Sequence, residues 1–332
     1  MSGPLLSVDG LVKHFPIRGG VLQRRRGTVH AVNGVSFTVE AGQTLALVGE
    51  SGCGKSTVGR TIMRFHAPTA GRVTFDGRDL GSLPSGALRA VRRDLQYVFQ
   101  DPYASLPARM PVGEIVAEPL AIHGIGDRSR RRDRVRELFD LVGLPAEAIT
   151  RYPHEFSGGQ RQRVGIARAL ALEPKLLILD EPVSALDVSI QAQVVNLLAR
   201  LQRELGVAYL FIAHDLAVVR HLAHRIAVMY LGHIVEYGDA DTVFTRPSHP
   251  YTQALLSAVP VPDPRLRDPG RRRLLVGDVP NPADPPSGCP FRTRCWKADE
   301  RCASQRPLLE IRTPSGASSA CHFAEEEAVV TP

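Results

Sequence analysis

The sequence predicts an α/β fold in which strands and helices alternate around a mixed core sheet. Two stretches indicate it: Leu45 to Val48 is an apolar strand that runs into a glycine-rich turn and a helix, and Leu176 to Leu179 is an uninterrupted apolar run closed by Asp180 and Glu181. Uninterrupted apolar runs are typical of strands buried on both faces of a parallel sheet. A chain of 332 residues is long for one domain, so we expect a core domain followed by an appended segment.

Composition restricts the class of protein. Hydrophobic residues make up 43% and charged residues 23% of the chain, as in ordinary globular proteins. The chain has no run of about 18 apolar residues and no signal-peptide layout at its N-terminus, so we expect a cytoplasmic protein without a membrane span. The formal charge of +7 includes arginine clusters at residues 24–26 and 128–136. These clusters suit a solvated surface or anionic lipid headgroups; because they lack interleaved aromatic residues, nucleic acid is not an expected partner.

The first strands are expected at residues 5–12 and 29–40, where apolar and polar residues alternate. They would form an antiparallel edge ahead of the glycine-rich turn. The stretch from Pro16 to Gly20, with the arginine cluster that follows it, predicts an inserted surface loop. Phe15, at the end of the first strand, is a candidate for stacking on adenine, although an ordinary half-buried phenylalanine fits the pattern as well.

The glycine-rich turn has the pattern of a phosphate-binding P-loop, and it lies between a strand and a helix as that motif requires. Its glycines would let backbone N–H groups face phosphate oxygens, and the start of the helix would add the positive end of its dipole. We expect Lys55 to neutralise the β- and γ-phosphates and Ser56 to ligate Mg²⁺. The nucleotide-binding residues predicted here are Gly49, Ser51, Gly52, Cys53, Gly54, Lys55, Ser56 and Thr57.

A helical insertion is predicted after two further strands. Residues 71–80 predict a strand and turn, and residues 95–99 a short strand that ends on Gln100. Prolines and then a charged, helix-prone run predict the helical insertion over residues 101 to about 165. It ends in a second glycine-rich turn, Ser157-Gly158-Gly159-Gln160, which opens another helix with Ser157 as its N-cap and offers a second anion site.

Polar residues follow two of the predicted buried strands. Ligands bind at the carboxyl ends of strands in open α/β sheets, so we expect Asp180 to bind Mg²⁺ through water and Glu181 to polarise an attacking water. A helix from about residue 187 to residue 205, ended by Gly206, precedes a strand over residues 207–213 that leads to His214. A lone histidine after a strand is more often structural than catalytic, but the phosphate site nearby favours a hydrogen bond to the γ-phosphate.

Together these motifs resemble the ATP-binding subunits of ABC transporters. The matching features are the P-loop, a Q-loop glutamine at Gln100, a signature with Phe156 in place of the leucine of LSGGQ, the Walker B pair Asp180 and Glu181, a D-loop from Ser184 to Asp187, and the switch histidine His214. The resemblance implies a P-loop NTPase ABC cassette with a mixed core sheet, an antiparallel β edge and a helical insertion. It also implies that ATP is sandwiched between the P-loop of one subunit and the signature turn of another.

The family pattern assigns roles to particular residues. It implies that Glu181, His214 and Gln100 act in hydrolysis and that Ser56, Gln100 and Asp180 hold Mg²⁺. It also implies nucleotide contacts from Ser157, Gly158, Gly159, Gln160 and Asp187.

Three further stretches, at residues 100–106, 152–159 and 249–256, resemble the dipeptide/oligopeptide importer branch, which includes nickel and glutathione importers. The resemblance runs from about residue 5 to residue 323 and implies an ATPase cassette over 1–240 and a C-terminal extension over 241–332. The implied partners are a second, distinct ATPase subunit, two permease subunits and, indirectly, an extracytoplasmic solute-binding protein, with the chain on the cytoplasmic face of the membrane. Pro107 departs from the asparagine-proline pair usual in this branch, where the subunit would touch its permease.

Other functions remain open at this point. The solute could be nickel or glutathione in place of a peptide. A soluble ABC ATPase that acts on nucleic acid or ribosomes is a different class, but such proteins typically fuse two cassettes, and this chain has one P-loop and one signature.

The tail contains four of the five cysteines, Cys289, Cys295, Cys302 and Cys321, behind a stretch rich in proline and arginine over residues 247–286 that predicts an extended wrap or linker. In a cytoplasmic protein, clustered cysteines indicate a metal site before they indicate disulfides. Zinc ligands usually come in pairs with roughly two to four residues between them, whereas five and six residues separate the close cysteines here. Wider spacing suits an iron–sulfur cluster, and the importer resemblance implies a [4Fe-4S] cluster on these four thiolates.

Overall fold

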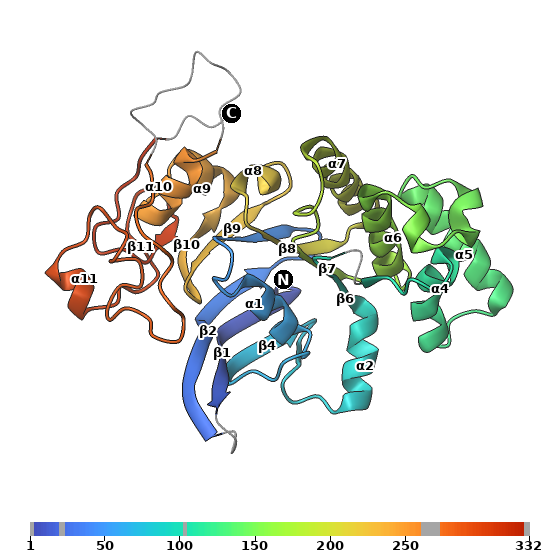
Figure 1. The fold of residues 1–332 in the computed structure, drawn as a ribbon, viewed down its shortest axis with the longest axis horizontal. Helices are drawn as coiled ribbons and strands as arrows, with labels where there is room; N and C mark the ends of the chain where they lie inside the picture. Colours follow the sequence, from blue (N-terminus) through green and yellow to red (C-terminus); the bar gives the residue numbers. More distant parts are fainter. Residues whose placement is uncertain (1–2, 20–23, 102–104, 260–272, 329–332) are drawn as a thin grey trace, which may run out of the picture. The chain divides into compact units, whose positions relative to one another are not determined.

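The computed structural model describes residues 3–19, 24–101, 105–259 and 273–328 (Figure 1). The chain forms two compact units. The P-loop unit comprises residues 5–38, 45–81 and those from 214 onward, and the helical unit comprises residues 39–44 and 82–213 with the first few residues of the chain.

The larger sheet of the P-loop unit leads into the phosphate-binding turn. Strand β3 runs parallel to β9, and the remaining neighbours are antiparallel. All five residues of β3 are buried, as the apolar run predicted. Two strands of the sheet, β11 and β12, come from the tail, so the tail is built into the sheet. In spatial order the strands are β11 (Glu310–Ile311), β12 (Ser318–Ser319), β10 (His233–Asp239), β9 (Arg225–Tyr230) and β3 (Thr44–Val48).

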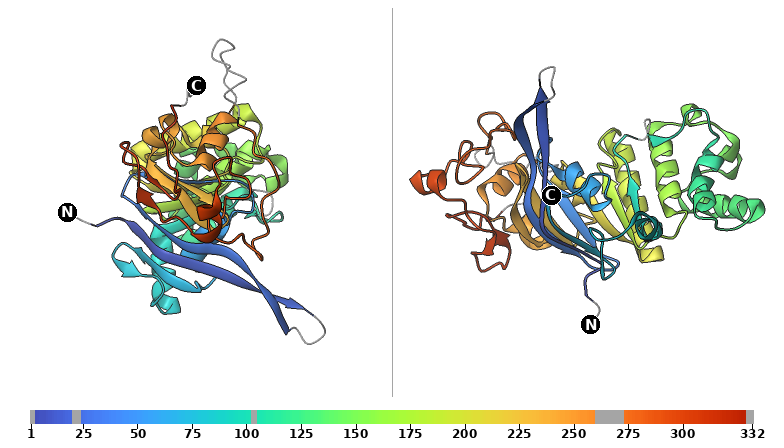
Figure 2. Two further views of the ribbon diagram at one scale, coloured as in Figure 1. Left: turned by 90° about the vertical axis from the view of Figure 1, so that its left-hand side faces the viewer. Right: turned by 90° about the horizontal axis from the view of Figure 1, so that it is seen from below.

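The second sheet of this unit has the order β2-β1-β4-β5. Its strands are β1 (Leu6–Gly19), β2 (Arg24–Val39), β4 (Ala70–Phe75) and β5 (Arg78–Asp79). Figure 2 shows β1 and β2 running side by side as a long ribbon. The surface loop predicted from Pro16 through the arginine cluster is therefore wrong, because both strands continue into it. Pairing of β1 with β4 ends at Val12, so beyond it one edge of β1 is free of β4, and proline is tolerated on such an edge.

The helices of the P-loop unit are short. They are α1 (Lys55–Ile62), α8 (Leu216–Val219), α9 (Ala240–Thr245), α10 (Pro250–Ser257) and α11 (Glu300–Ser304). Helix α10 begins at the N-cap His249, whose ring nitrogen Nδ1 accepts a hydrogen bond from the Tyr251 N–H. The extended segment predicted over residues 247–286 is thus helical at its start, and its residues 260–272 lie outside the described part of the chain.

Three parallel strands of the helical unit lie side by side in the order β8-β7-β6. They are β6 (Leu95–Val98), β7 (Leu176–Asp180) and β8 (Ala208–Ala213), and every residue of β7 and β8 is buried. The strands predicted at 95–99, 176–179 and 207–213 are confirmed to within one residue at each end.

The helical insertion is confirmed as a set of helices and 3₁₀ turns. Helix α5 starts at Asp127, whose carboxylate accepts from the Arg130 N–H, and it buries Val135, Leu138 and Phe139 at helical spacing. The elements are α4 (Val112–Ile122), α5 (Arg128–Leu141), η1 (Ala146–Thr150), η2 (Pro153–Glu155) and the start of α6 (Gly158–Leu170). Outside the insertion, α2 (Ser85–Asp94) was not predicted, and α7 (Val188–Leu205) ends at Gly206 in the left-handed conformation, as predicted.

Within the described ranges, each helix is too short or too polar to traverse a lipid bilayer.

Candidate nucleotide site

The phosphate-binding turn is held in a shape that only glycine permits. Gly49, Gly52 and Gly54 have φ values of 153°, 80° and 104°, in the region that side chains disfavour. A Cβ atom on Gly49 would lie 2.1 Å from the Met229 carbonyl oxygen, and one on Gly54 would lie 2.1 Å from that of Ala31. The carbonyl groups of Met229 and Ala31 therefore lie against the backbone of the loop. The loop keeps the concave shape, or cradle, that phosphate oxygens require.

Lys55 lies inside this cradle. Its side chain is 3% exposed, and its Nζ atom donates to the carbonyl oxygens of Gly49 and Glu50 at 2.8 and 2.9 Å. Helix α1 begins at Lys55, and its N-cap Gly54 offers no side-chain cap, so the first N–H groups of the helix suit an anion. The residues of this loop fit a nucleoside triphosphate as substrate. Its phosphate oxygens would accept hydrogen bonds from the Lys55 ammonium and from the first N–H groups of α1.

Two other loop residues differ in exposure. Ser51 is exposed, whereas Cys53 is 2% exposed. The pKa of the Cys53 thiol is raised, because burial raises it by more than the Lys55 charge lowers it. Cys53 therefore contributes backbone to the loop, and its side chain is a neutral thiol. Ser56 and Thr57 are half-buried on the first turn of α1.

The tail contacts the P-loop, which the sequence did not predict. Arg294 forms an ion pair with the Glu50 carboxylate, and the Tyr251 hydroxyl accepts from the Glu50 N–H. Tyr251 lies in one of the stretches that resemble peptide importers, and this resemblance was the one feature of the sequence that could have drawn attention to it. No feature of the sequence pointed to Arg294.

Phe15 lies on β1, half-buried, with its ring edge-on to His66 at a centroid distance of 5.3 Å. The Lys13 ammonium lies 4.7 Å from the ring centroid. Its role as an adenine-stacking residue stays a prediction.

The helical unit brings together the acidic half of the predicted site. Asp180, at the end of β7, is fully buried, and the Tyr97 hydroxyl of β6 donates to its Oδ2 at 2.6 Å. Gln100 Nε2 donates to Glu181 Oε2 at 3.0 Å. Tyr97 was not singled out from the sequence, because the pairing of β6 with β7 places it beside Asp180.

Glu181 has an unusual backbone. Its φ is 46°, a left-handed conformation that is costly for a residue with a side chain and that occurs often at active sites. Its N–H donates to the Ile212 carbonyl of β8, and its carbonyl oxygen accepts from the Ser184 hydroxyl. These two bonds fix the backbone of Glu181, and the Gln100 amide binds its Oε2.

The signature turn forms a capped helix start. Ser157 is the N-cap of α6: the Gln160 N–H donates to its Oγ at 3.3 Å, and Gln160 Oε1 accepts from the Ser157 N–H at 3.0 Å. This confirms the predicted N-cap. A Cβ atom on Gly159 would lie 2.5 Å from Ile190 Cγ2, and one on Gly158 would lie 3.2 Å from Leu186 Cδ2. The signature turn and the D-loop region therefore pack directly on each other.

The remaining predicted residues lie on exposed positions. Asp187 is the exposed N-cap of α7 without a side-chain cap bond, and His214 directly follows β8. The structure therefore groups Gln100, Asp180 and Glu181 in the helical unit and the P-loop residues in the other unit. Ser56 and Asp180, which were expected to share Mg²⁺, belong to different units.

The tail cysteines do not form the predicted cluster site. Within the described ranges, no three His, Cys, Asp or Glu side chains are arranged so that they could hold a metal ion. Cys289, Cys295, Cys302 and Cys321 are free and border a cavity of about 10 Å³, which is near the limit for one water. Burial raises the pKa of Cys289 and of Cys321 to about 11. The prediction of a [4Fe-4S] cluster is contradicted.

The cradle, its buried lysine and the strand-end carboxylates define the class of P-loop nucleotide hydrolases. Residues 32–184 match the family described as ABC transporter, and residues 235–302 match the family described as oligopeptide/dipeptide transporter, C-terminal region. The chain belongs to the ATP-binding subunits of ABC transporters, in the dipeptide/oligopeptide importer family. It binds ATP and is an ATPase of that family.

Relatives cover almost the whole chain. The oligopeptide transport ATP-binding protein OppF of Salmonella typhimurium is 55% identical over 309 residues, 92% of this chain and 92% of its own length. A Brucella ovis protein with the provisional name of peptide import ATP-binding protein is 54% identical over 310 residues, 93% of this chain and 95% of its own. A Bacillus subtilis protein, provisionally named as an oligopeptide transport ATP-binding protein, is 53% identical over 321 residues, 96% and 95%.

Solved structures match the fold. The dimeric ATP-binding cassette MJ0796 bound to ADP and Pi has a TM-score of 0.63 at 29% identity, covering 71% of this chain and 98% of that chain. The cbiO1 protein of Clostridium perfringens, part of the ABC transporter complex cbiONQ, has a TM-score of 0.63 at 28% identity, covering 73% and 90%.

Proposed function

We propose that this chain powers the import of di- or oligopeptides through a membrane ABC transporter by hydrolysing ATP. One observation carries the proposal: the chain is 53–55% identical, over more than nine-tenths of its length, to proteins named for peptide or oligopeptide transport. The match of residues 235–302 to the oligopeptide/dipeptide transporter region supports it. In this scheme residues 1–240 form the ATPase cassette and residues 241–332 the extension particular to the importers.

The chemistry is divided among the residues of the two units. Lys55 and the P-loop N–H groups bind the phosphates, and Ser56, Asp180 and Gln100 would hold Mg²⁺, which would offset the charge of the phosphates. Glu181, whose Oε2 is oriented by the Gln100 amide, polarises the attacking water. His214 contacts the γ-phosphate, and Phe15 stacks on adenine. Ser157 to Gln160 and Asp187 complete the ATP site of a neighbouring subunit.

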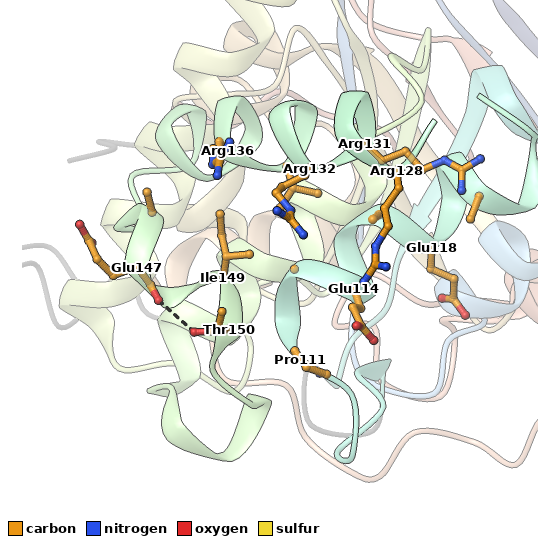
Figure 3. Close-up of a pocket in the computed structure, with 15 residues that line it drawn as sticks. Pro111, Glu114, Glu118, Arg128, Arg131, Arg132, Arg136, Glu147, Ile149 and Thr150 are labelled. Carbon is orange, nitrogen blue, oxygen red and sulfur yellow. Dashed lines mark hydrogen bonds between the residues drawn. The ribbon is translucent and has the colours of Figure 1, made fainter. Parts of the chain in front are cut away.

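The assembly consists of this chain, a second, distinct ATPase subunit and two permease subunits on the cytoplasmic face of the membrane, with a solute-binding protein outside. A groove of about 800 Å³ in the helical unit, between α4, α5 and η1, supports permease docking (Figure 3). Arg128 and Arg132 line it, and both are exposed without an ion pair among the described residues. Glu118, on the same groove, is neutralised by Arg168 at 2.6 Å. Glu114 and Glu147 also line the groove, so it suits a short helix that carries apolar side chains and charges of both signs.

The proposal is tested by recovering the complex from its own membranes. The chain is tagged in its native host, membranes are solubilised in detergent, and the co-purified proteins are identified by mass spectrometry. We expect two permease subunits and a second ATPase subunit. Recovery of ribosomal proteins without a permease would contradict the proposal, and recovery of this chain as the sole ATPase would contradict the heterodimer.

Transport is then measured with the same complex in sealed vesicles supplied with the solute-binding protein. Radiolabelled peptide should enter only with ATP, and a Glu181→Gln complex is the matched control that binds ATP without turnover. Uptake of Ni²⁺ or glutathione with no peptide uptake would assign a different solute to this importer.

A further inference from the structure

Three contacts from different parts of the chain meet at Glu50, the second residue of the phosphate-binding turn. Arg294 of the C-terminal extension donates from Nη1 to Oε2 at 2.6 Å and from Nη2 to Oε1 at 3.0 Å. The Glu50 N–H donates to the Tyr251 hydroxyl at 2.8 Å. Its carbonyl oxygen accepts from Lys55 Nζ at 2.9 Å. The side chain, the N–H and the C=O of one loop residue are therefore all held, two of them by residues of the extension.

The ion pair is shielded from water. The Arg294 side chain is 5% exposed and that of Glu50 26% exposed. The guanidinium lies 5.9 Å from the ring centroid of Tyr230, and Tyr230, Tyr251 and Phe291 pack with centroid distances of 4.8 to 5.4 Å. A bidentate arginine–carboxylate pair in such surroundings is stronger and more directional than an exposed pair.

Charge explains why this pair matters for the site. The loop must attract the highly negative triphosphate of ATP, and Lys55 supplies positive charge for that purpose. Glu50 places a carboxylate on the same turn, with its backbone bonded to the Lys55 ammonium. Without a partner, that carboxylate would repel the phosphates.

We propose that Arg294 is a positioning residue of the nucleotide site: it neutralises and orients Glu50, so that ATP binding by the P-loop depends on the docked C-terminal extension. The inference goes beyond peptide import, because it concerns ATP binding by this chain alone. It assigns the extension a part in the ATPase, through a residue that does not touch the nucleotide.

The test uses the full-length chain and Mg-ATP, with affinity measured by isothermal titration calorimetry. Arg294→Met should raise the Kd for ATP about 10-fold, because an uncompensated charge then lies on the loop. KM should rise similarly while kcat changes little, since the lost interaction serves the ground state and the transition state alike. Neutralising the carboxylate as well, in Arg294→Met with Glu50→Gln, should return the Kd to within about threefold of the wild type.

Arg292→Met is the matched control. Arg292 lies in the same segment, is half-buried, and donates from Nε to the Ser287 carbonyl oxygen within the extension. Its replacement should leave the ATP affinity unchanged.

Two results would overturn the proposal. An Arg294→Met protein with wild-type affinity would show that Glu50 needs no partner. A double variant as weak as Arg294→Met would show that the pair serves only the fold. Should Arg294→Met not fold, Arg294→Gln, which keeps a donor for Glu50, is compared with its Glu50→Gln double variant under the same two criteria.

Discussion

Glu50 and Glu181 are two carboxylates with opposite surroundings. Glu50 is bound at both oxygens by the positive guanidinium of Arg294, whereas Glu181 Oε2 accepts from the neutral amide of Gln100. A carboxylate in a bidentate ion pair has little capacity left for a proton from water, and a neutral amide does not offset the charge of Glu181. This difference favours Glu181 as the residue that polarises the attacking water.

Lys55→Ala and Glu181→Gln should therefore fail in different ways. Loss of the Lys55 ammonium removes charge from the phosphate cradle, so ATP affinity should fall by at least about 10-fold. Glu181→Gln keeps the shape and loses the base, so ATP should bind normally while kcat falls by about 100-fold or more. Calorimetry and phosphate release measure the two effects. Near-normal turnover in Glu181→Gln would contradict the assignment of Glu181 as the residue that polarises the attacking water.

The residues that were predicted from sequence are those whose role is fixed by neighbours in the chain. The P-loop glycines and the Ser157 N-cap act on backbone within a few positions. Arg294 and Tyr251 reach Glu50 from 244 and 201 residues away in the chain, and no local pattern predicts a contact over such a distance. The cysteine prediction was wrong for a related reason, since spacing along a tail does not determine how its thiols converge.

At the scale of elements, the signature turn and helix α7 are coupled by close packing. Ile190 leaves no room for a side chain on Gly159. Gly159→Ala should displace the start of α7 together with the D-loop, and it should lower ATP-dependent pairing of subunits and ATPase activity about 10-fold or more.

A compensating change distinguishes crowding from loss of an anion contact. In Gly159→Ala with Ile190→Ala the added methyl group has room, so activity should recover substantially. Ile190→Ala alone serves as the control. A double variant as inactive as Gly159→Ala would contradict packing as the cause. Size-exclusion chromatography with ATP in a Glu181→Gln background reads out the pairing.

Elements with continuous apolar runs were predictable, and those defined by a distant partner were not. Strands β7 and β8 are buried throughout and were confirmed from sequence. The far ends of β1 and β2 contain Pro16 and an arginine cluster, which locally indicate a loop, yet backbone pairing extends the ribbon. Strands β11 and β12 have two residues each; β10 offers an edge to β12, and β12 offers one to β11.

For the whole molecule, buried histidines make stability depend on pH. The pKa of His249 is lowered to about 3 and that of His233 to about 4, chiefly by burial. These values include a second lowering effect, from the Arg306 charge on His233, and the opposing effect of a backbone hydrogen bond on each histidine. An unfolded histidine titrates near 6.5. Below about pH 6.5 the unfolded chain therefore binds protons that the folded chain does not, so this contribution to stability is complete above pH 6.5 and is lost as the pH falls toward 4.

Within that window, each of these histidines should lower the free energy of unfolding by about 1.4 kcal/mol for each pH unit that the pH falls. His249→Asn keeps an N-cap side chain for α10 and does not titrate. The unfolding free energy of this variant should therefore fall less steeply between pH 6.5 and 4.5 than that of the wild type, as measured by denaturant titration. Parallel curves for the two proteins would exclude His249 as a source of the pH dependence.

The separation of 244 positions between Glu50 and Arg294 also sets an order of events during synthesis. A ribosome releases the P-loop long before the arginine that completes its surroundings. A nascent or truncated chain that lacks this arginine therefore displays the phosphate-binding turn with an uncompensated carboxylate, and its nucleotide site matures only when the segment that contains Arg294 docks. Maturation of ATP binding thus reports that translation has passed Arg294, and a chain cut short before residue 294 would join an assembly as a poor competitor for ATP.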